Sequence, residues 1–226
     1  MSFTRIPLSI AIALISACTS PPPTPDWQAN AFEALNHFTS AYLSGNTRLA
    51  NFEFDRAKAE IASTGRADVM ARAELVRCAA QMASLNVSPC TGYAPWAKDA
   101  ALPEQAYATF LSGQWDTLDA TQLPAHYQPL LTAVQHHQPS VHEPLSHIGD
   151  PLARLVAASL LLKKELLTPV GIALAVDSAS QQGWRKPLLA WLGVQLKAAQ
   201  NKGDNELAER IQRRMKVVVH RAAGDG

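Results

Sequence analysis

Histidines between residues 126 and 147 form the densest group of chemically versatile side chains in this 226-residue chain. Five of its seven histidines lie there, with Glu143 among them: His126, His136, His137, His142 and His147. Imidazole is the commonest protein ligand for transition metals and can also act as a general acid or base. One interpretation of the sequence is therefore an enzyme or a metal-binding protein built on residues 126–147.

The spacing of these histidines differs from that of known zinc motifs. The pattern His-Glu-x-x-His places two imidazoles four residues apart on one helical face. Here His142 and His147 are five residues apart, and Pro144 stands between them. We therefore expect residues 138–148 to form a solvated polar loop off any helix. We expect no metal or other cofactor, and if the alternative interpretation holds, its ligands would be His136, His142 and His147.

Other catalytic patterns are missing from the chain. It contains no Gly-x-Ser-x-Gly elbow, no phosphate-binding loop and no Ser-x-x-Lys. No residue stands out as a nucleophile or a base, so we expect that the protein is not an enzyme. Its 20 basic and 19 acidic residues nearly balance, and this balance argues against nucleic acid as a partner.

The start of the chain has the pattern of an export signal. Arg5 provides a positive charge, and residues 6–17 are uncharged and mostly apolar. Such a run is too short to remain as a membrane-spanning helix. It ends in Ile15-Ser16-Ala17-Cys18, which resembles the lipobox of bacterial lipoproteins. A plain cleaved signal with an incidental cysteine is the alternative.

The lipobox resemblance implies where the protein resides. Residues 1–17 would be a signal peptide, and Cys18 would become the first residue of the mature protein, acylated with fatty acids such as palmitate. Thr19 is not aspartate, which in that family suggests the outer membrane, facing the periplasm. Residues 18–25 hold four prolines, which favour extended geometry at ~3.1 Å per residue. We interpret them as a stiff spacer between lipid and fold.

The other two cysteines, Cys78 and Cys90, form an even pair in what would be an oxidising compartment, which indicates a disulfide. Cys78 lies late in a helix expected over residues 67–84, and Cys90 lies in the turn that follows. The bond would hold this turn against the helix and contribute about 2–3 kcal/mol. A metal site needs more ligands than two cysteines provide, and the redox pattern Cys-x-x-Cys is absent.

Composition favours an all-α fold, since alanine and leucine dominate and β-branched runs are nearly absent. We expect one domain over residues 26–222, with a less regular middle segment at 89–150. Helices are expected on both sides of this segment, at 26–45, 47–63, 67–84, 151–162, 169–182, 184–201 and 204–219. In the second helix, Leu49, Phe52, Ala57 and Ile61 are expected to face inward. Trp96 and Trp115, in the irregular middle, are candidates for a partner groove.

One stretch resembles a tetratricopeptide repeat. Trp191-Leu192-Gly193, Leu196, Gly203-Asp204 and Ala208 match its small residue at a helix crossing, its turn and its alanine in the second helix. The first helix is too long for the pattern, and the closing proline is missing. The resemblance implies antiparallel helical hairpins stacked as a short solenoid, and an irregular helical bundle is the alternative.

These expectations combine into one functional hypothesis. The chain would be a lipid-anchored periplasmic scaffold, held in membrane lipid through Cys18, that binds another envelope protein or its peptide during assembly of secretion, pilus or outer-membrane machinery. The alternative is a periplasmic enzyme or metal-binding lipoprotein that uses residues 126–147. A scaffold predicts a groove without converging titratable groups, whereas an enzyme predicts a compact pocket where a histidine meets a carboxylate.

Overall fold

The computed structural model describes residues 24–138 and 140–223, and within these ranges it contains helices and no strand. The expected all-α fold class is therefore confirmed. The expected signal peptide, Cys18 and most of the spacer lie outside the described residues. No helix in the described part of the chain is long and apolar enough to cross a membrane.

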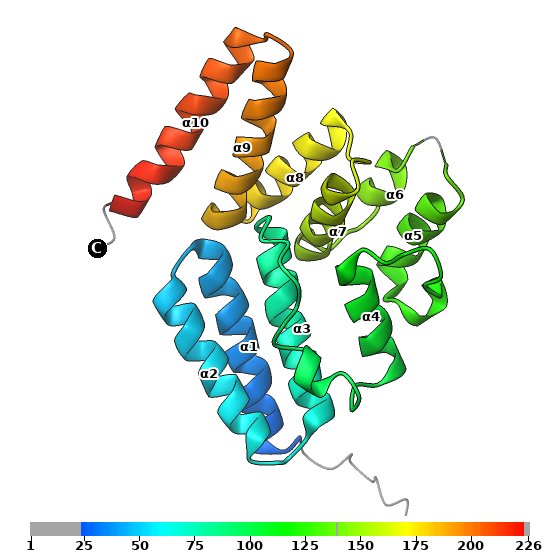
Figure 1. Ribbon diagram of the computed structural model, residues 1–226. Coiled ribbons are helices and arrows are strands. Elements are labelled where there is room, and N and C mark those ends of the chain that lie inside the picture. The colour runs from blue at the N-terminus through cyan, green and yellow to red at the C-terminus, as the bar shows by residue number, and fades with distance from the viewer. Residues whose placement is uncertain (1–23, 139, 224–226) are drawn as a thin grey trace, which may run out of the picture.

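Three long helices form the amino-terminal part: α1 (Asp26–Ser44), α2 (Thr47–Ala62) and α3 (Ala67–Ala83). They lie side by side in Figure 1. Gly45 allows the tight turn between α1 and α2 because its φ of 88° falls in the left-handed region. The side chain of Asn46 then caps α2 by accepting a hydrogen bond from the backbone N–H of Leu49.

The middle of the chain contains shorter elements: η1 (Ala94–Trp96), α4 (Leu102–Ser112), η2 (Ala120–Gln122), η3 (Ala125–Tyr127), α5 (Gln128–Gln135) and α6 (His142–Ser146). The expected loop at 138–148 is wrong at α6. Val141, Leu145 and Ile148 follow helical spacing and are buried, so their burial favours a helical turn. Pro144 is tolerated there because first-turn N–H groups need no intrahelical partner.

Four helices complete the chain: α7 (Pro151–Lys163), α8 (Pro169–Gln181), α9 (Arg185–Asn201) and α10 (Asn205–Ala223). α7 packs between α3 and α8, and nearly every residue from Ala153 to Leu161 is buried. This burial agrees with its apolar sequence on all sides. Asp150 and Thr168 cap α7 and α8 through their side-chain oxygens.

A continuous core joins these helices, and two tryptophans lie inside it. The indole N–H of Trp191 donates to the backbone oxygen of Ala83 at 3.1 Å, which ties α9 to the end of α3. The indole N–H of Trp115 donates to the oxygen of Phe110 at 2.8 Å. Trp115 is only 1% exposed, and it contributes to the wall of a cavity that Asp116 and His137 also line, so its expected role in a partner groove stays a prediction.

Two expected inward positions of α2 are also wrong. Leu49 is 44% exposed and Phe52 is 63% exposed. The other two expected positions, Ala57 and Ile61, are buried, and the buried face continues from them through Phe54 and Ala50 at regular helical steps. The expected stripe is therefore displaced around the helix axis in the first turns of α2 and correct in the last turns.

The tetratricopeptide-like stretch forms the hairpin of α9 and α10, and Gly203, with φ of 71°, lies in its turn. Gly193 does not lie at a close helix crossing, because a Cβ atom added there would meet no other atom within 4 Å. The described helices pack as an all-α assembly, and the small-residue crossing expected from the repeat pattern is absent at Gly193.

Candidate binding cleft

The histidine-bearing segment presents most of its imidazoles to solvent. His126, His136, His137 and His147 are exposed, and His142 is half-buried. The Nδ1 atom of His136 lies 2.9 Å from the backbone oxygen of Thr132 on its own helix. Over residues 24–138 and 140–223, no three histidine, cysteine, aspartate or glutamate side chains gather as a metal-binding cluster.

Two histidines lie near carboxylates without forming a catalytic pair. Although the His126 side chain is exposed, partial desolvation by its neighbours lowers its pKa, and the nearby charge of Asp150 partly opposes this effect. The carboxylate of Asp150 is already engaged, since its Oδ1 accepts a hydrogen bond of 2.7 Å from the N–H of Ala153. His137 and Asp116 line the same cavity of about 670 Å³, and neither makes an ion pair within the described part of the chain.

The cysteine pair joins α3 to the segment that follows it. The sulfur atoms of Cys78 and Cys90 are at bonding distance, and their Cα atoms are 5.5 Å apart, a separation that suits a disulfide. Cys78 is buried on α3 and Cys90 is half-buried in the segment after α3. The pair therefore holds the segment 86–93 against the side of α3.

An ion pair between a buried carboxylate and a half-buried arginine lies beneath this segment. Glu74 is 7% exposed, and its carboxylate contacts the guanidinium of Arg77 one turn later on α3. The Arg77 guanidinium also lies 4.7 Å from the centre of the Phe54 ring. Gly92 covers the ion pair so closely that an added Cβ atom would overlap both Glu74 and Arg77. A side chain at residue 92 would therefore displace the Glu74 and Arg77 head groups from their present contact.

Between this segment and α4 lies a cavity of about 460 Å³, which we call the clamped cleft. Met82 and the buried Leu111 form its floor, and Lys163 contributes the charged group of its wall. The remaining lining comes from the two sides: Val87, Ser88, Pro89, Cys90, Tyr93, Ala97, Gln105, Ala108, Thr109, Ser112 and Gln114.

The polar groups of the clamped cleft are mostly engaged within α4. The hydroxyls of Thr109 and Ser112 donate to backbone oxygens one turn earlier, at 3.0 Å and 2.7 Å. The Lys163 ammonium lies 3.5 Å from the backbone oxygen of Ser112, which leaves further donors for a ligand. The arrangement can hold an apolar group above Met82 and Leu111 and an acceptor oxygen at Lys163, and its lining contains no histidine and no carboxylate.

A second cavity, of about 470 Å³, opens between α1 and α3 and is called the tether-side hollow. Its wall begins at Thr24 and continues along the α1 residues Gln28, Ala29, Leu35 and their neighbours, and across from them lie Ile61, Val69 and Arg72. Trp27 and Phe32 stand at its edge, half-buried and 68% exposed respectively.

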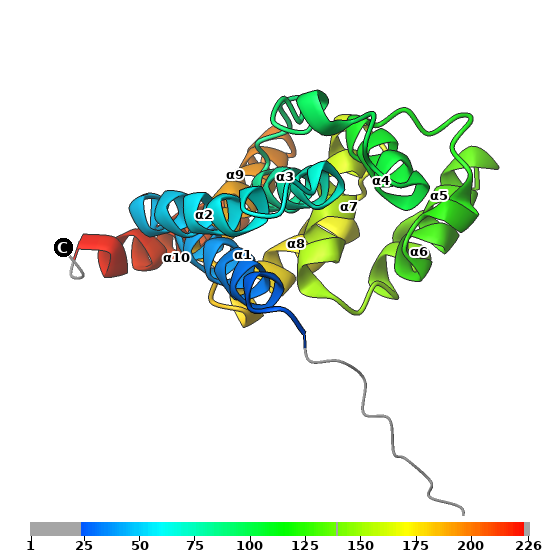
Figure 2. The same ribbon diagram turned by 90° about the horizontal axis from the view of Figure 1, so that it is seen from below.

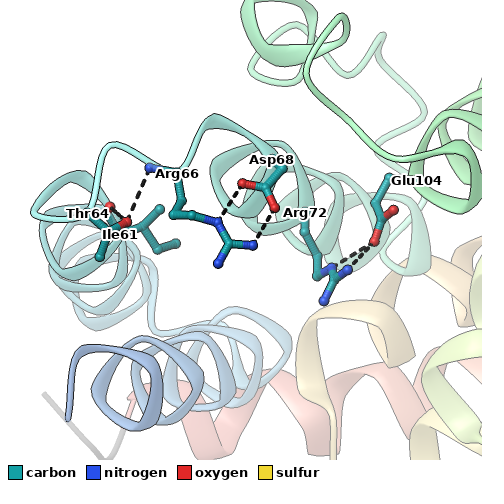
Figure 3. A network of polar contacts seen from close by, with 6 residues as sticks. All are labelled: Ile61, Thr64, Arg66, Asp68, Arg72 and Glu104. Carbon is teal, nitrogen blue, oxygen red and sulfur yellow. Dashed lines mark hydrogen bonds and ion pairs between the residues drawn. The ribbon is translucent and has the colours of Figure 1, made fainter. Parts of the chain in front are cut away.

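Figure 3 shows how the arginines beside the tether-side hollow are held. Arg66 donates two hydrogen bonds to the carboxylate of Asp68, at 2.9 Å and 2.6 Å, and these bonds lower the pKa of Asp68 to about 2. Arg72 pairs with Glu104 of α4, with Nε 2.8 Å from Oε1. Both arginines are therefore already neutralised by a carboxylate.

The two cavities lie on different sides of α3. In Figure 2, the segment after α3 that carries η1 lies on one side of that helix, and the first turn of α1 lies on the other. The clamped cleft borders the former and the tether-side hollow the latter. If the protein is held through the part of the chain that precedes Thr24, the clamped cleft, on the other side of α3, stays accessible to a ligand.

Several residues of these surfaces were not identified from the sequence. Glu74, Arg77, Gly92 and Lys163 had no assigned role, although Glu74 and Arg77 are spaced for a helical ion pair and Gly92 follows Cys90 closely. Trp96, expected near a groove, is half-buried and packs against the small core cluster beneath the tether-side hollow. Its side chain lines neither cavity.

Comparison of the chain with protein-family models, with curated proteins and with solved structures gives no match.

Proposed function

We propose that the protein is a lipid-anchored periplasmic adaptor of the outer membrane that holds a segment of another envelope protein in the clamped cleft. The lipobox-like sequence ending at Cys18 and the proline-rich spacer support the anchor. The cysteine pair at bonding distance suits an oxidising compartment outside the cytosol.

The observation that carries the proposal is the construction of the clamped cleft. Three features fix its outer wall, namely the Cys78–Cys90 pair, the Glu74–Arg77 ion pair and the close contact of Gly92. A wall fixed before binding reduces the ordering cost that a ligand must overcome. The fold already has a continuous core, so a wall fixed in this way contributes more to recognising a partner than to stabilising the fold.

The chemistry of the clamped cleft specifies the partner segment. An apolar side chain fits above Met82 and Leu111, where water is displaced from an apolar floor. Lys163 supplies a positive charge at one end, so the segment should carry a carboxylate near that apolar side chain. An acidic side chain or a free C-terminus would satisfy this requirement.

Site-specific crosslinking in intact cells tests the proposal. A photoreactive benzoylphenylalanine at Thr109, in the clamped cleft, should capture a specific envelope protein, identified by mass spectrometry. The same group at Asn51, exposed on α2, is the matched control and should not capture it. Lys163→Glu should abolish the capture from Thr109 because it reverses the charge that the partner meets.

Two results would contradict the adaptor function. Crosslinking at Thr109 could yield no specific envelope protein, or it could yield the same set of proteins as crosslinking at Asn51. Separately, a Cys18→Ser variant should be released from the membrane fraction, and its retention there would count against the anchor.

A further inference from the structure

We infer that the edge of the tether-side hollow, with Trp27 and Phe32, rests on the phospholipid surface that holds the anchor. The inference depends on the lipid anchor of the proposed function and on no property of the clamped cleft. It assigns a ligand, the headgroup and upper acyl region of a phospholipid layer, to a second face of the molecule.

The length of the chain between the anchor and the fold places this face near lipid. Thr24 is part of the wall of the tether-side hollow, and it follows Cys18 by six residues. Even a fully extended chain spans only ~3.3–3.6 Å per residue, so this connection reaches at most about 20 Å. The hollow therefore cannot move far from the membrane to which Cys18 is attached.

The side chains at this edge are those that favour a lipid interface. Phe32 is 68% exposed, which is unusual for so large an apolar group, and the half-buried Trp27, five residues before it on α1, lines the same hollow. Aromatic rings are enriched where membranes meet water, because they offer a large apolar surface and, in tryptophan, a polar N–H. The apolar floor behind them includes Ala31 and Ile61.

The two arginines that line the tether-side hollow do not favour an anionic lipid. Arg66 is paired with Asp68 and Arg72 with Glu104 (Figure 3). We therefore expect contact with zwitterionic phospholipid, driven by the aromatic side chains and insensitive to salt. The contact can be weak on its own, since the tether keeps the local concentration of lipid high.

Fluorescence quenching by brominated phospholipids tests the inference. The full lipidated protein is reconstituted into zwitterionic vesicles whose acyl chains carry bromine, which quenches tryptophans that reach the lipid. The wild-type protein should lose fluorescence relative to unbrominated vesicles, and Trp27→Phe should remove at least half of that loss. Trp184→Phe is the matched control, because Trp184 is also half-buried but precedes Arg185, which lies against Gly45 at the far end of α1.

A second pair of variants tests the neighbouring ring. Phe32→Ser should reduce the quenching of Trp27, whereas Phe52→Ser, which removes an equally exposed ring from α2 (63% against 68%), should leave it unchanged. A quenching that is absent from the wild type, or unchanged in Trp27→Phe, would overturn the inference. A protein that remains with the vesicles without quenching contradicts only this inference, while one that fails to remain with them contradicts the anchor itself.

Discussion

Two irregular segments, residues 86–93 and 138–148, leave the preceding helix in the same way and are then held against the fold by different contacts. α3 is followed by Leu85 in the left-handed region (φ 62°), and α5 is followed by His137 in that region (φ 50°). In both, the N–H of this left-handed residue and the N–H of the residue after it donate to carbonyls of the last helical turn, at Met82 and Gln81 in one and at Val134 and Ala133 in the other. The two segments therefore leave their helices by one shared C-terminal motif.

After this motif the segments differ in what faces inward. In residues 86–93, the cysteine pair and the ion pair under Gly92 connect the segment to α3. In residues 138–148, three apolar side chains enter the core, and the histidines remain at or near the surface. The chemically versatile side chains therefore hold the structure together at residues 86–93, whereas at residues 138–148 they lie at or near the surface. Only residues 86–93 form a wall of the clamped cleft.

The largest loss of stability should come from shortening a buried apolar side chain in residues 138–148. Leu145 is 1% exposed, so Leu145→Ala should lower the free energy of unfolding by about 2–5 kcal/mol through lost burial and a residual cavity. Urea denaturation followed by circular dichroism measures this change. Leu166→Ala, at a side chain that is 41% exposed, is the control and should cost far less. Equal losses would mean that Leu145 does not hold the segment.

Removing the cysteine pair should have the next largest effect. The double variant Cys78→Ala with Cys90→Ala should lower the free energy of unfolding by about 2–3 kcal/mol, because the unfolded chain regains the freedom that the crosslink removes. Hydrogen exchange should also become faster in residues 84–93 and stay unchanged in residues 138–148. A loss of protection in both segments would show that they are not held independently.

Two glycine substitutions compare the segments directly. Gly92→Ala should destabilise the protein by about 1–3 kcal/mol, since the added methyl group overlaps the Glu74–Arg77 pair. Gly149→Ala, after the histidine segment, meets open space without a positive φ and should change stability by no more than about 1 kcal/mol. Thermal denaturation of the two variants measures the difference, and an inverted order would contradict the close approach at Gly92.

The smallest effect should come from the exposed imidazoles. His136→Ala and His147→Ala should each change the free energy of unfolding by less than about 0.5 kcal/mol. Added zinc should leave the melting temperature of the wild-type protein unchanged, because the described residues bring no third ligand to these histidines. If zinc raises the melting temperature and the two substitutions abolish the rise, the metal-binding interpretation of residues 126–147 would be restored.

Periodicity and capping residues made the long helices predictable from sequence. The ends of α2, α3 and α8 fall within about two residues of the expected positions, because Gly45, Gly65 and Pro169 punctuate strong apolar patterns. α6 was missed because histidines and Pro144 conceal the helical spacing of its buried residues.

The candidate site was less predictable than the helices. The cysteine pair followed from counting cysteines, but the burial of Glu74 did not, since an i, i+3 ion pair normally lies on a solvated face. The preference for glycine at residue 92 has no signal in the sequence, because it arises from the close contact of this segment with Glu74 and Arg77 of α3. Lys163, which meets α4 from far along the chain, had no local signal at all.

Peptide mapping by mass spectrometry of the protein isolated from cell membranes tests the central claim, that an exported and anchored chain is clamped by its cysteine pair. The account predicts an amino-terminal peptide that begins at Cys18 and carries acyl chains, together with a peptide pair linked through Cys78 and Cys90. An amino-terminal peptide that still contains residues 1–17, or free thiols at both Cys78 and Cys90, would contradict it.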